Sequence, residues 1–176
     1  QSEILAANER DMTAAAAKGM TSTMLDRLKL TAERISGMAD GLRQVAGLAD
    51  PVGNVIDGKT LPNGLHITKI RVPLGVIGII YEARPNVTAD AAGLCLKSGN
   101  AVILKGGSEA MESNKTVAAI LAQAAEGAGI PAGSIQFIDT SDRKAVQDLI
   151  HMNGLVDVVI PRGGAGLIQA VVRNAS

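Results

Sequence analysis

From residue 73 onward, short apolar runs alternate with segments of helical periodicity, and this alternation restricts the fold more than any other feature of the sequence. The apolar runs cover residues 75–80, 101–104, 134–138 and 156–160. The helical segments cover residues 88–97, 112–126, 141–152 and 167–173, with Ser141 expected to cap the third. Four successive strand–helix units predict an α/β fold, a Rossmann-like parallel sheet of about four strands with flanking helices.

Two other parts precede these units. Residues 1–50 are predicted to form a helical layer of three helices, the last one capped by Thr31. Residues 51–72 follow as two strands around a turn. A two-stranded arm is marginally stable alone and has a free pairing edge, so residues 52–72 favour an oligomer contact over a free surface hairpin. Residues 73–176 would then form the βα domain itself.

Composition excludes several classes of function. The sequence holds 17 lysines and arginines against 17 aspartates and glutamates, and this zero net charge argues against a nucleic-acid partner. The aromatic residues are only Tyr81 and Phe137, which leaves almost nothing to stack on bases. One cysteine and two histidines predict neither a disulfide framework nor a metal site. No apolar run reaches the roughly 18–20 residues of a membrane span, so we expect a cytoplasmic protein.

Ligands of such sheets bind outside the carboxyl ends of the strands, which directs attention to three loops. The loop after the fourth strand contains Arg162, Gly163 and Gly164 and opens a helix, a pattern that suits a bound anion. The alternative is a tight turn that needs glycine for its backbone angles.

The loops after the first two strands carry further candidates. Lys105 and Ser108 could hold a phosphate and Glu109 ribose hydroxyls, with Gly106 and Gly107 between them; the alternative is a solvated loop with a surface lysine. In the first loop, Arg84 suits capture of a carboxylate or phosphate and stands beside Asn86; the alternative is a surface arginine at a helix start.

Cys95 is the one candidate thiol nucleophile. It falls in mid-helix at an apolar position, among alanines and leucines. A reactive thiolate needs an exposed, electropositive setting, so Cys95 is interpreted as structural.

Three stretches of the sequence then carry a family resemblance: residues 71–88 (RVPLGVIGIIYEARPNVT), the motif CLKSGN at 95–100 leading to LKGG at 104–107, and IPRGGAGL at 160–167. They resemble the bacterial γ-glutamyl phosphate reductases, within the aldehyde dehydrogenase superfamily, and the match extends over essentially the whole chain. The resemblance implies reduction of L-glutamyl 5-phosphate by NADPH to glutamate 5-semialdehyde and phosphate, in proline biosynthesis. A cysteine thiolate of the family forms the intermediate thioester.

The resemblance also implies roles for individual residues. Lys105, Ser108 and Glu109 match contacts to the adenosine ribose and 2′-phosphate, with either Ser108 or Glu109 on the ribose. Gly129 and Pro131 match the adenine pocket, and Arg162, Gly163 and Gly164 the segment near the pyrophosphate. Arg84 falls at the oxyanion position of related dehydrogenases, which makes Arg84 or Asn86 the candidate to hold substrate. Residues 65–73 match a strand used in subunit assembly.

The catalytic cysteine of the family lies downstream of every segment matched here, and Cys95 matches a non-catalytic position. We therefore expect this chain to be the cofactor-binding part of a reductase, with the catalytic domain absent and no activity by itself. Two alternatives stay open. One is a non-catalytic dinucleotide-binding or oligomerisation module, and the other is the reductase half of a bifunctional pyrroline-5-carboxylate synthase.

Overall fold

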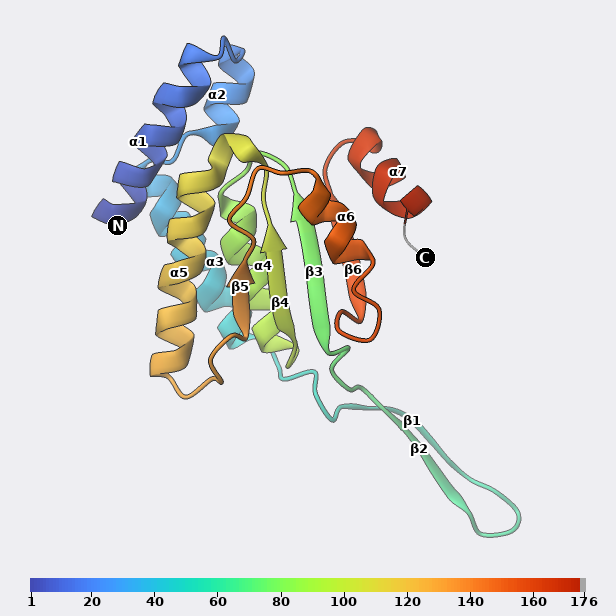
Figure 1. Ribbon diagram of the computed structural model, residues 1–176. Helices are drawn as coiled ribbons and strands as arrows, with labels where there is room; N and C mark the ends of the chain where they lie inside the picture. The colour runs from blue at the N-terminus through green and yellow to red at the C-terminus, as the bar shows by residue number, and fades with distance from the viewer. Residues whose placement is uncertain (175–176) are drawn as a thin grey trace.

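The computed structural model describes residues 1–174, and its centre is the parallel sheet that the sequence predicts (Figure 1). Its strands are β3 (Val76–Tyr81), β4 (Ala101–Lys105), β5 (Ile135–Phe137) and β6 (Val158–Arg162). They lie in the order β5-β4-β3-β6, and every neighbouring pair is parallel. The chain therefore steps outward from β3 to β5 and returns to the other side of β3 with β6. This change of direction creates a switch point between β3 and β6, where ligands of such sheets bind.

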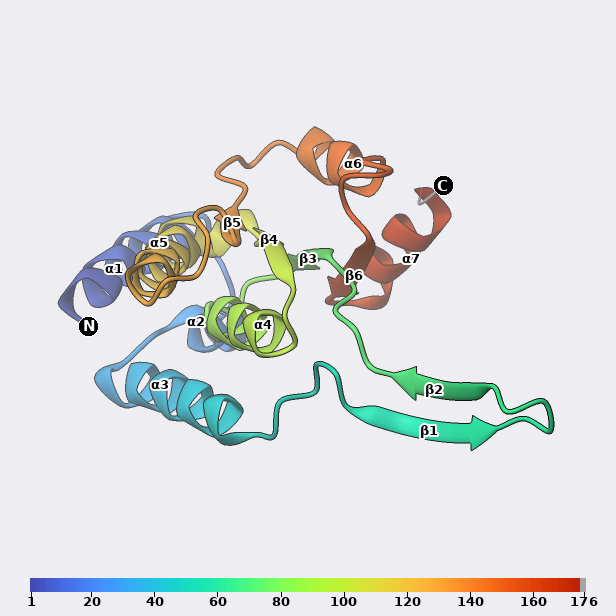
Figure 2. The ribbon, with the colours of Figure 1, turned by 90° about the horizontal axis from the view of Figure 1, so that it is seen from below.

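Helices cover both faces of this sheet, and Figure 2 shows α4 and α6 on opposite sides of it. The helices are α4 (Asn86–Lys97), α5 (Met111–Gly127), α6 (Lys144–Ile150) and α7 (Ala165–Asn174), with a 3₁₀ turn η1 (Ser108–Ala110) before α5. Alternate residues of β3 point to alternate faces. Ile77 and Ile79 pack in the cluster with α4 and α5, and Ile80 packs with α6 and α7. Both faces of β3 are thus buried, as its uninterrupted apolar run indicates.

The third helix of these units begins later than predicted. The Ser141 cap is wrong: α6 starts at Lys144 with Arg143 at its N-cap position. The backbone N–H of Asp142 donates to Thr140 Oγ1 at 3.2 Å, and the N–H of Lys144 donates to Asp142 Oδ1 at 2.8 Å. These side-chain oxygens hold the segment in a turn and delay the helix, because short polar side chains compete with the helical backbone for its donors.

The N-terminal layer consists of α1 (Ser2–Ala17), α2 (Ser22–Leu28) and α3 (Ala32–Gly47). Thr31 caps α3 as predicted, since its Oγ1 accepts from the N–H of Arg34 at 3.2 Å. Buried polar side chains of α1 tie the layer to the sheet domain. Asp11 accepts from the N–H of Ser113 at 2.7 Å in the first turn of α5, and Asn8 contacts backbone on both sides of Lys29. These bonds fix where α2 ends, and α2 carries part of the site described below.

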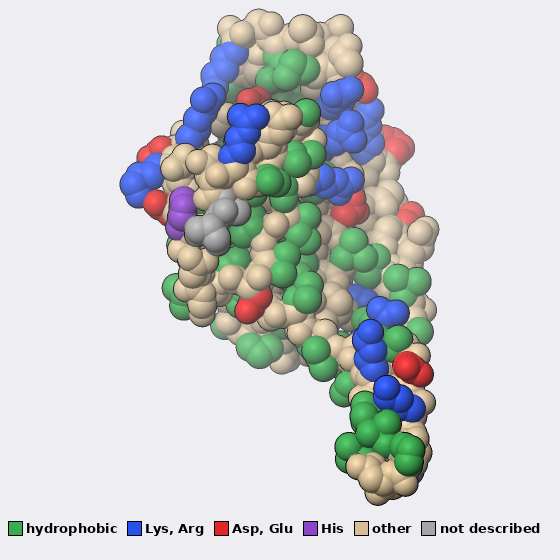
Figure 3. Space-filling view, turned by 90° about the vertical axis from the view of Figure 1, so that its right-hand side faces the viewer, with side chains coloured by type: hydrophobic (Ala, Val, Ile, Leu, Met, Phe, Trp, Pro, Cys, Tyr) green, Lys and Arg blue, Asp and Glu red, His purple; other side chains and the backbone are tan. Residues whose placement is uncertain are grey.

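The predicted arm is present as β1 (Val55–Thr60) and β2 (His66–Ile70), an antiparallel pair that extends away from the body of the molecule. Every residue of both strands is exposed. In Figure 3 hydrophobic side chains gather near the end of the arm, and basic side chains lie nearer its base. The arm therefore gains no stability from the core described above.

Candidate functional site

The loops that follow β3 and β6 meet at the switch point. The backbone N–H of Gly164, where α7 begins, donates to Glu82 Oε1 at 3.0 Å. A Cβ on Gly163 would lie 2.6 Å from Glu82 Cδ and 2.8 Å from Leu167 Cδ2, so the glycine permits this approach. The predicted anion site at the start of α7 thus contacts a carboxylate of the chain itself. Glu82 is a site residue that the sequence analysis did not select, although it lies in the first of the three loops.

A cavity of about 340 Å³ opens beside this contact. Its lining residues are Arg27, Tyr81, Glu82, Arg84, Val87, Arg162, Gly163 and Gly164. The structure therefore brings the predicted residues of the first and fourth loops together. It adds Arg27, which comes from α2 and was also missed. The only signal for Arg27 in the sequence is its position in the Asp26-Arg27-Leu28 segment of the N-terminal layer.

Lys105 ends β4 and is buried, with 5% of its surface exposed. Its Nζ donates to the carbonyl of Gly106 at 3.0 Å. Burial lowers the pKa of Lys105, and the nearby Glu109 carboxylate partly offsets this effect. The alternative of a surface lysine in a solvated loop is therefore wrong. An ammonium group has three N–H donors, and this one is held in place at the carboxyl edge of the sheet with a single protein acceptor among the described residues.

Gly106 is buried, and its role in the structure is to leave space. A Cβ there would overlap Nδ2 of Asn114 and lie 3.3 Å from Tyr81 Cε2. Tyr81 shares a 2.6 Å hydrogen bond with Thr88, whose Oγ1 donates to Asn114 Oδ1 at 3.0 Å. Burial raises the pKa of the Tyr81 phenol. This buried network fixes the backbone on which Lys105 stands.

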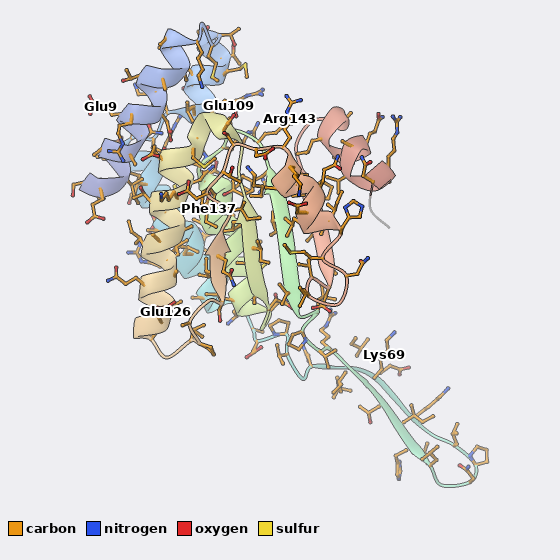
Figure 4. The ribbon with its side chains drawn as sticks, viewed as in Figure 1. Glu9, Lys69, Glu109, Glu126, Phe137 and Arg143 are labelled. Atoms are coloured by element: carbon orange, nitrogen blue, oxygen red, sulfur yellow. The ribbon has the colours of Figure 1, made fainter. Side chains whose placement is uncertain are left out.

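The two ribose candidates differ in their surroundings. Ser108 is exposed in η1, whereas Glu109 is half-buried and lines a second cavity, of about 350 Å³, with Arg27 and Arg84. A Cβ on Gly107 would lie 2.7 Å from Glu109 Oε2, so Gly107 allows this carboxylate to fold back over the loop. Figure 4 shows Glu109 at the carboxyl edge of the sheet.

Arg84 and Asn86 flank the buried Pro85, where α4 begins. Both line a third cavity, of about 390 Å³, between α4 and the N-terminal layer. Asn86 Nδ2 donates to Asp90 Oδ2 at 3.3 Å, while Arg84 is exposed. Both substrate candidates thus lie at the cavities rather than on a distant surface.

Gly129 and Pro131 lie elsewhere. They are exposed and connect the end of α5 to the start of β5. Figure 4 shows Glu126, near them in sequence, at the end of α5 opposite to Glu109. The predicted adenine contact is therefore at the amino edge of the sheet, and the structure does not bring it together with Lys105 or Gly163. The loop before a parallel strand and the loop after it lie at opposite edges of the sheet.

Cys95 is buried at 5% exposure among apolar residues of the α4 face, so the prediction of a buried, apolar position is confirmed. Burial raises the pKa of its thiol, which opposes formation of a thiolate at neutral pH. Within residues 1–174, no group of three or more His, Cys, Asp or Glu side chains is placed to hold a metal ion. No helix in that range has the length and apolar character needed to cross a membrane.

Comparison with known proteins gives the family. The model of the aldehyde dehydrogenase family matches residues 2–176. The chain belongs to the aldehyde dehydrogenase family. The aldehyde dehydrogenase family implies a nicotinamide cofactor. The fold described above is that of solved aldehyde dehydrogenase structures.

Several similar proteins carry the same name. The chain is 61% identical over 176 residues to γ-glutamyl phosphate reductase of Moorella thermoacetica, and 58% identical to that of Heliobacterium modesticaldum. It covers 42% of the length of each. The crystal structure of γ-glutamyl phosphate reductase from Thermotoga maritima superposes with a TM-score of 0.96 at 45% identity, over 99% of this chain and 42% of that one. The chain thus corresponds to less than half of each of these enzymes.

Proposed function

We propose that this chain is the cofactor-binding part of a cytoplasmic γ-glutamyl phosphate reductase, which reduces L-glutamyl 5-phosphate with NADPH in proline biosynthesis. The support is the 61% identity over the whole chain to an enzyme of that name, together with the arrangement of the carboxyl edge. The chain spans 42% of that enzyme, so the activity and the substrate are proposed for the whole enzyme.

The buried ammonium of Lys105 is the observation that carries cofactor binding. A lysine with 5% exposure and one carbonyl partner has donors to offer to an anion at the edge of the sheet. In this proposal Lys105 binds a phosphate or hydroxyl of the cofactor, and Glu109 lies ready for the ribose. Gly163 and Gly107 carry no side chain, and the space beside them is filled by the Glu82 and Glu109 carboxylates, so a dinucleotide reaches this backbone when those two side chains turn away. When bound, NADPH would supply the hydride.

The Glu82 side chain occupies the place where a pyrophosphate would bind. Its carboxylate already accepts from the N–H of Gly164, at the place where the fourth loop would contact a phosphate. Two anions do not share one donor, so the Glu82 side chain has to move when a pyrophosphate arrives there. Glu82 is exposed, and its side chain has room to turn away.

The nucleophile has to come from outside the residues seen here. Cys95 is the only cysteine of the sequence, and it is buried with a raised pKa. We therefore expect that the chain binds NADPH and does not by itself reduce an acyl phosphate.

A titration of the purified chain with NADPH, followed by the cofactor's fluorescence, tests this proposal. Lys105→Met should weaken binding about tenfold or more, because a charge-assisted hydrogen bond is lost. Lys69→Met, on the exposed arm, is the matched control and should bind like the parent. Equal affinity of the Lys105→Met variant and the parent would refute the assigned site.

The arm supports a proposal about assembly. Its strands expose Val55, Ile56, Ile67 and Ile70, and the edge of a two-stranded ribbon is free to pair. We propose that residues 52–72 join copies of the protein into a homo-oligomer. Light scattering on Ile67→Lys should show a smaller mass than the parent at equal concentration. An unchanged mass would remove the arm from the interface.

A further inference from the structure

Arg27 and Arg84 are the two residues that line all three cavities at the carboxyl edge. They come from different parts of the chain, Arg27 from the last turn of α2 and Arg84 from the loop after β3. Nothing in the sequence suggests that they meet. The three cavities, of about 340 to 390 Å³ each, adjoin at these two residues and are together called the hollow.

Neither guanidinium has a partner within residues 1–174. Three other arginines of the molecule are paired: Arg34 with Asp26, Arg10 with Glu112 and Arg43 with Asp40. Arg27 and Arg84 make neither an ion pair nor a side-chain hydrogen bond there.

The carboxylates that share these walls are mostly engaged elsewhere. Asp26 is paired with Arg34, Asp90 accepts from Asn86, and Glu82 accepts from Gly164. Neither guanidinium group thus forms an ion pair with these carboxylates, and Arg162 adds a further positive charge at one of the three cavities. Glu109 lines only one of the three cavities and lies close enough to Lys105 to affect its pKa.

The start of α4 adds positive electrostatic potential at the same place. The helix begins at Asn86, without a side-chain cap and without an acidic residue in its first turn. Its N-terminal end carries a partial positive charge, and Pro85 and Asn86 form part of the wall. The hollow is thus suited to an anion with more than one negative charge.

We propose that Arg27 and Arg84 together form a binding site for a phosphoryl dianion. A guanidinium group binds two oxygens of a phosphate side by side, and two guanidinium groups match a double negative charge. A carboxylate would neutralise only one of them. The dianion can come from an acyl phosphate or from the phosphate of a nucleotide. The choice of the acyl phosphate as substrate rests on the proposed function.

Calorimetric titration of the purified chain with inorganic phosphate, acetyl phosphate and acetate tests this site. Arg27→Gln and Arg84→Gln should each weaken the binding of both phosphates about tenfold or more, and Arg84→Lys should restore part of the loss. Arg43→Gln removes the same charge from an exposed helix position outside the three cavities and should leave binding unchanged. Far-ultraviolet circular dichroism confirms that each variant is folded.

Three results would overturn the proposal: unchanged phosphate binding in both glutamine variants, an equal loss in Arg43→Gln, or acetate bound as tightly as phosphate. Titrations with NADPH and NADH identify the source of the dianion. If the variants bind both phosphates more weakly but keep the preference for NADPH over NADH, the site serves an acyl phosphate. If they also lose the preference for NADPH over NADH, it serves the nucleotide, and either result supports the site. The NADPH titration of Lys105→Met is independent of these phosphate titrations, and it tests the proposed function alone.

Discussion

The glycine that follows Lys105 offers a sharp test of how the site is built. In Gly106→Ala the new Cβ would overlap the amide of Asn114, lie 3.1 Å from its Cγ and approach the ring of Tyr81. Asn114 has no exposed surface, and it holds Thr88 through a 3.0 Å hydrogen bond. The amide therefore cannot swing into solvent, and relief requires either a backbone shift or loss of that bond.

The expected cost follows from these two options. Overpacking a close-packed interior costs about 1–3 kcal/mol, and losing a buried hydrogen bond adds about 1 kcal/mol. We expect Gly106→Ala to lower the free energy of unfolding by about 2–4 kcal/mol. Urea unfolding followed by circular dichroism measures this change, provided that the dependence on urea stays the same.

Two further variants separate the clash from the general effect of replacing a glycine. Gly41→Ala, in α3 with nothing within 4 Å of the new Cβ, should be stabilising by about 0.5–1 kcal/mol. In the Asn114→Ala background the cost of Gly106→Ala should largely disappear, because the overlapping amide is gone. If Gly106→Ala unfolds like the parent, or costs as much without Asn114, the steric argument is refuted.

Three other outcomes follow from the buried groups. Burial raises the pKa of Tyr81, so the folded state keeps its proton above pH ~10 while the unfolded state loses it. Stability should thus be complete below that pH and fall as the pH rises above it. Since Tyr81 is the only tyrosine, its phenolate absorbance should appear together with unfolding; a phenolate in the folded protein would contradict this. Cys95 should react with a thiol reagent only as fast as the protein opens, so a fast reaction under native conditions would disprove its burial. Asp11→Ala should lower the free energy of unfolding by about 2–3 kcal/mol, because Ser113 loses the acceptor of its N–H and Oγ–H groups. A change below about 0.5 kcal/mol would show that water replaces the carboxylate.

Most helices and strands could be predicted because the residues within each of them determine its secondary structure. The uninterrupted apolar run of β3 indicates a strand covered on both faces, and Thr31 marks the start of α3. The start of α6 was misplaced because Thr140 and Asp142 compete for the same backbone donors. Ser141 and Arg143 are both possible N-cap positions for α6, and the sequence pattern alone does not distinguish between them.

The site was only half predictable, since much of it depends on contacts between distant segments. Arg162 and Gly163 stand out through the glycine-rich turn, but Arg27 reaches the hollow only because Asn8 and Asp11 hold the N-terminal layer against α5. The burial of Lys105 likewise follows from the packing around β4 and not from its neighbours in sequence. Gly129 was grouped with these residues by motif, although the direction of β5 places it at the other edge.

Hydrogen–deuterium exchange of the purified chain with and without NADPH tests the central claim most directly. If the carboxyl edge binds the cofactor, NADPH should slow exchange in peptides covering residues 105–109 and 162–166, and leave residues 128–134 unchanged. Protection confined to residues 128–134, or no protection anywhere at saturating NADPH, would contradict the placement of the cofactor at the carboxyl edge of the sheet.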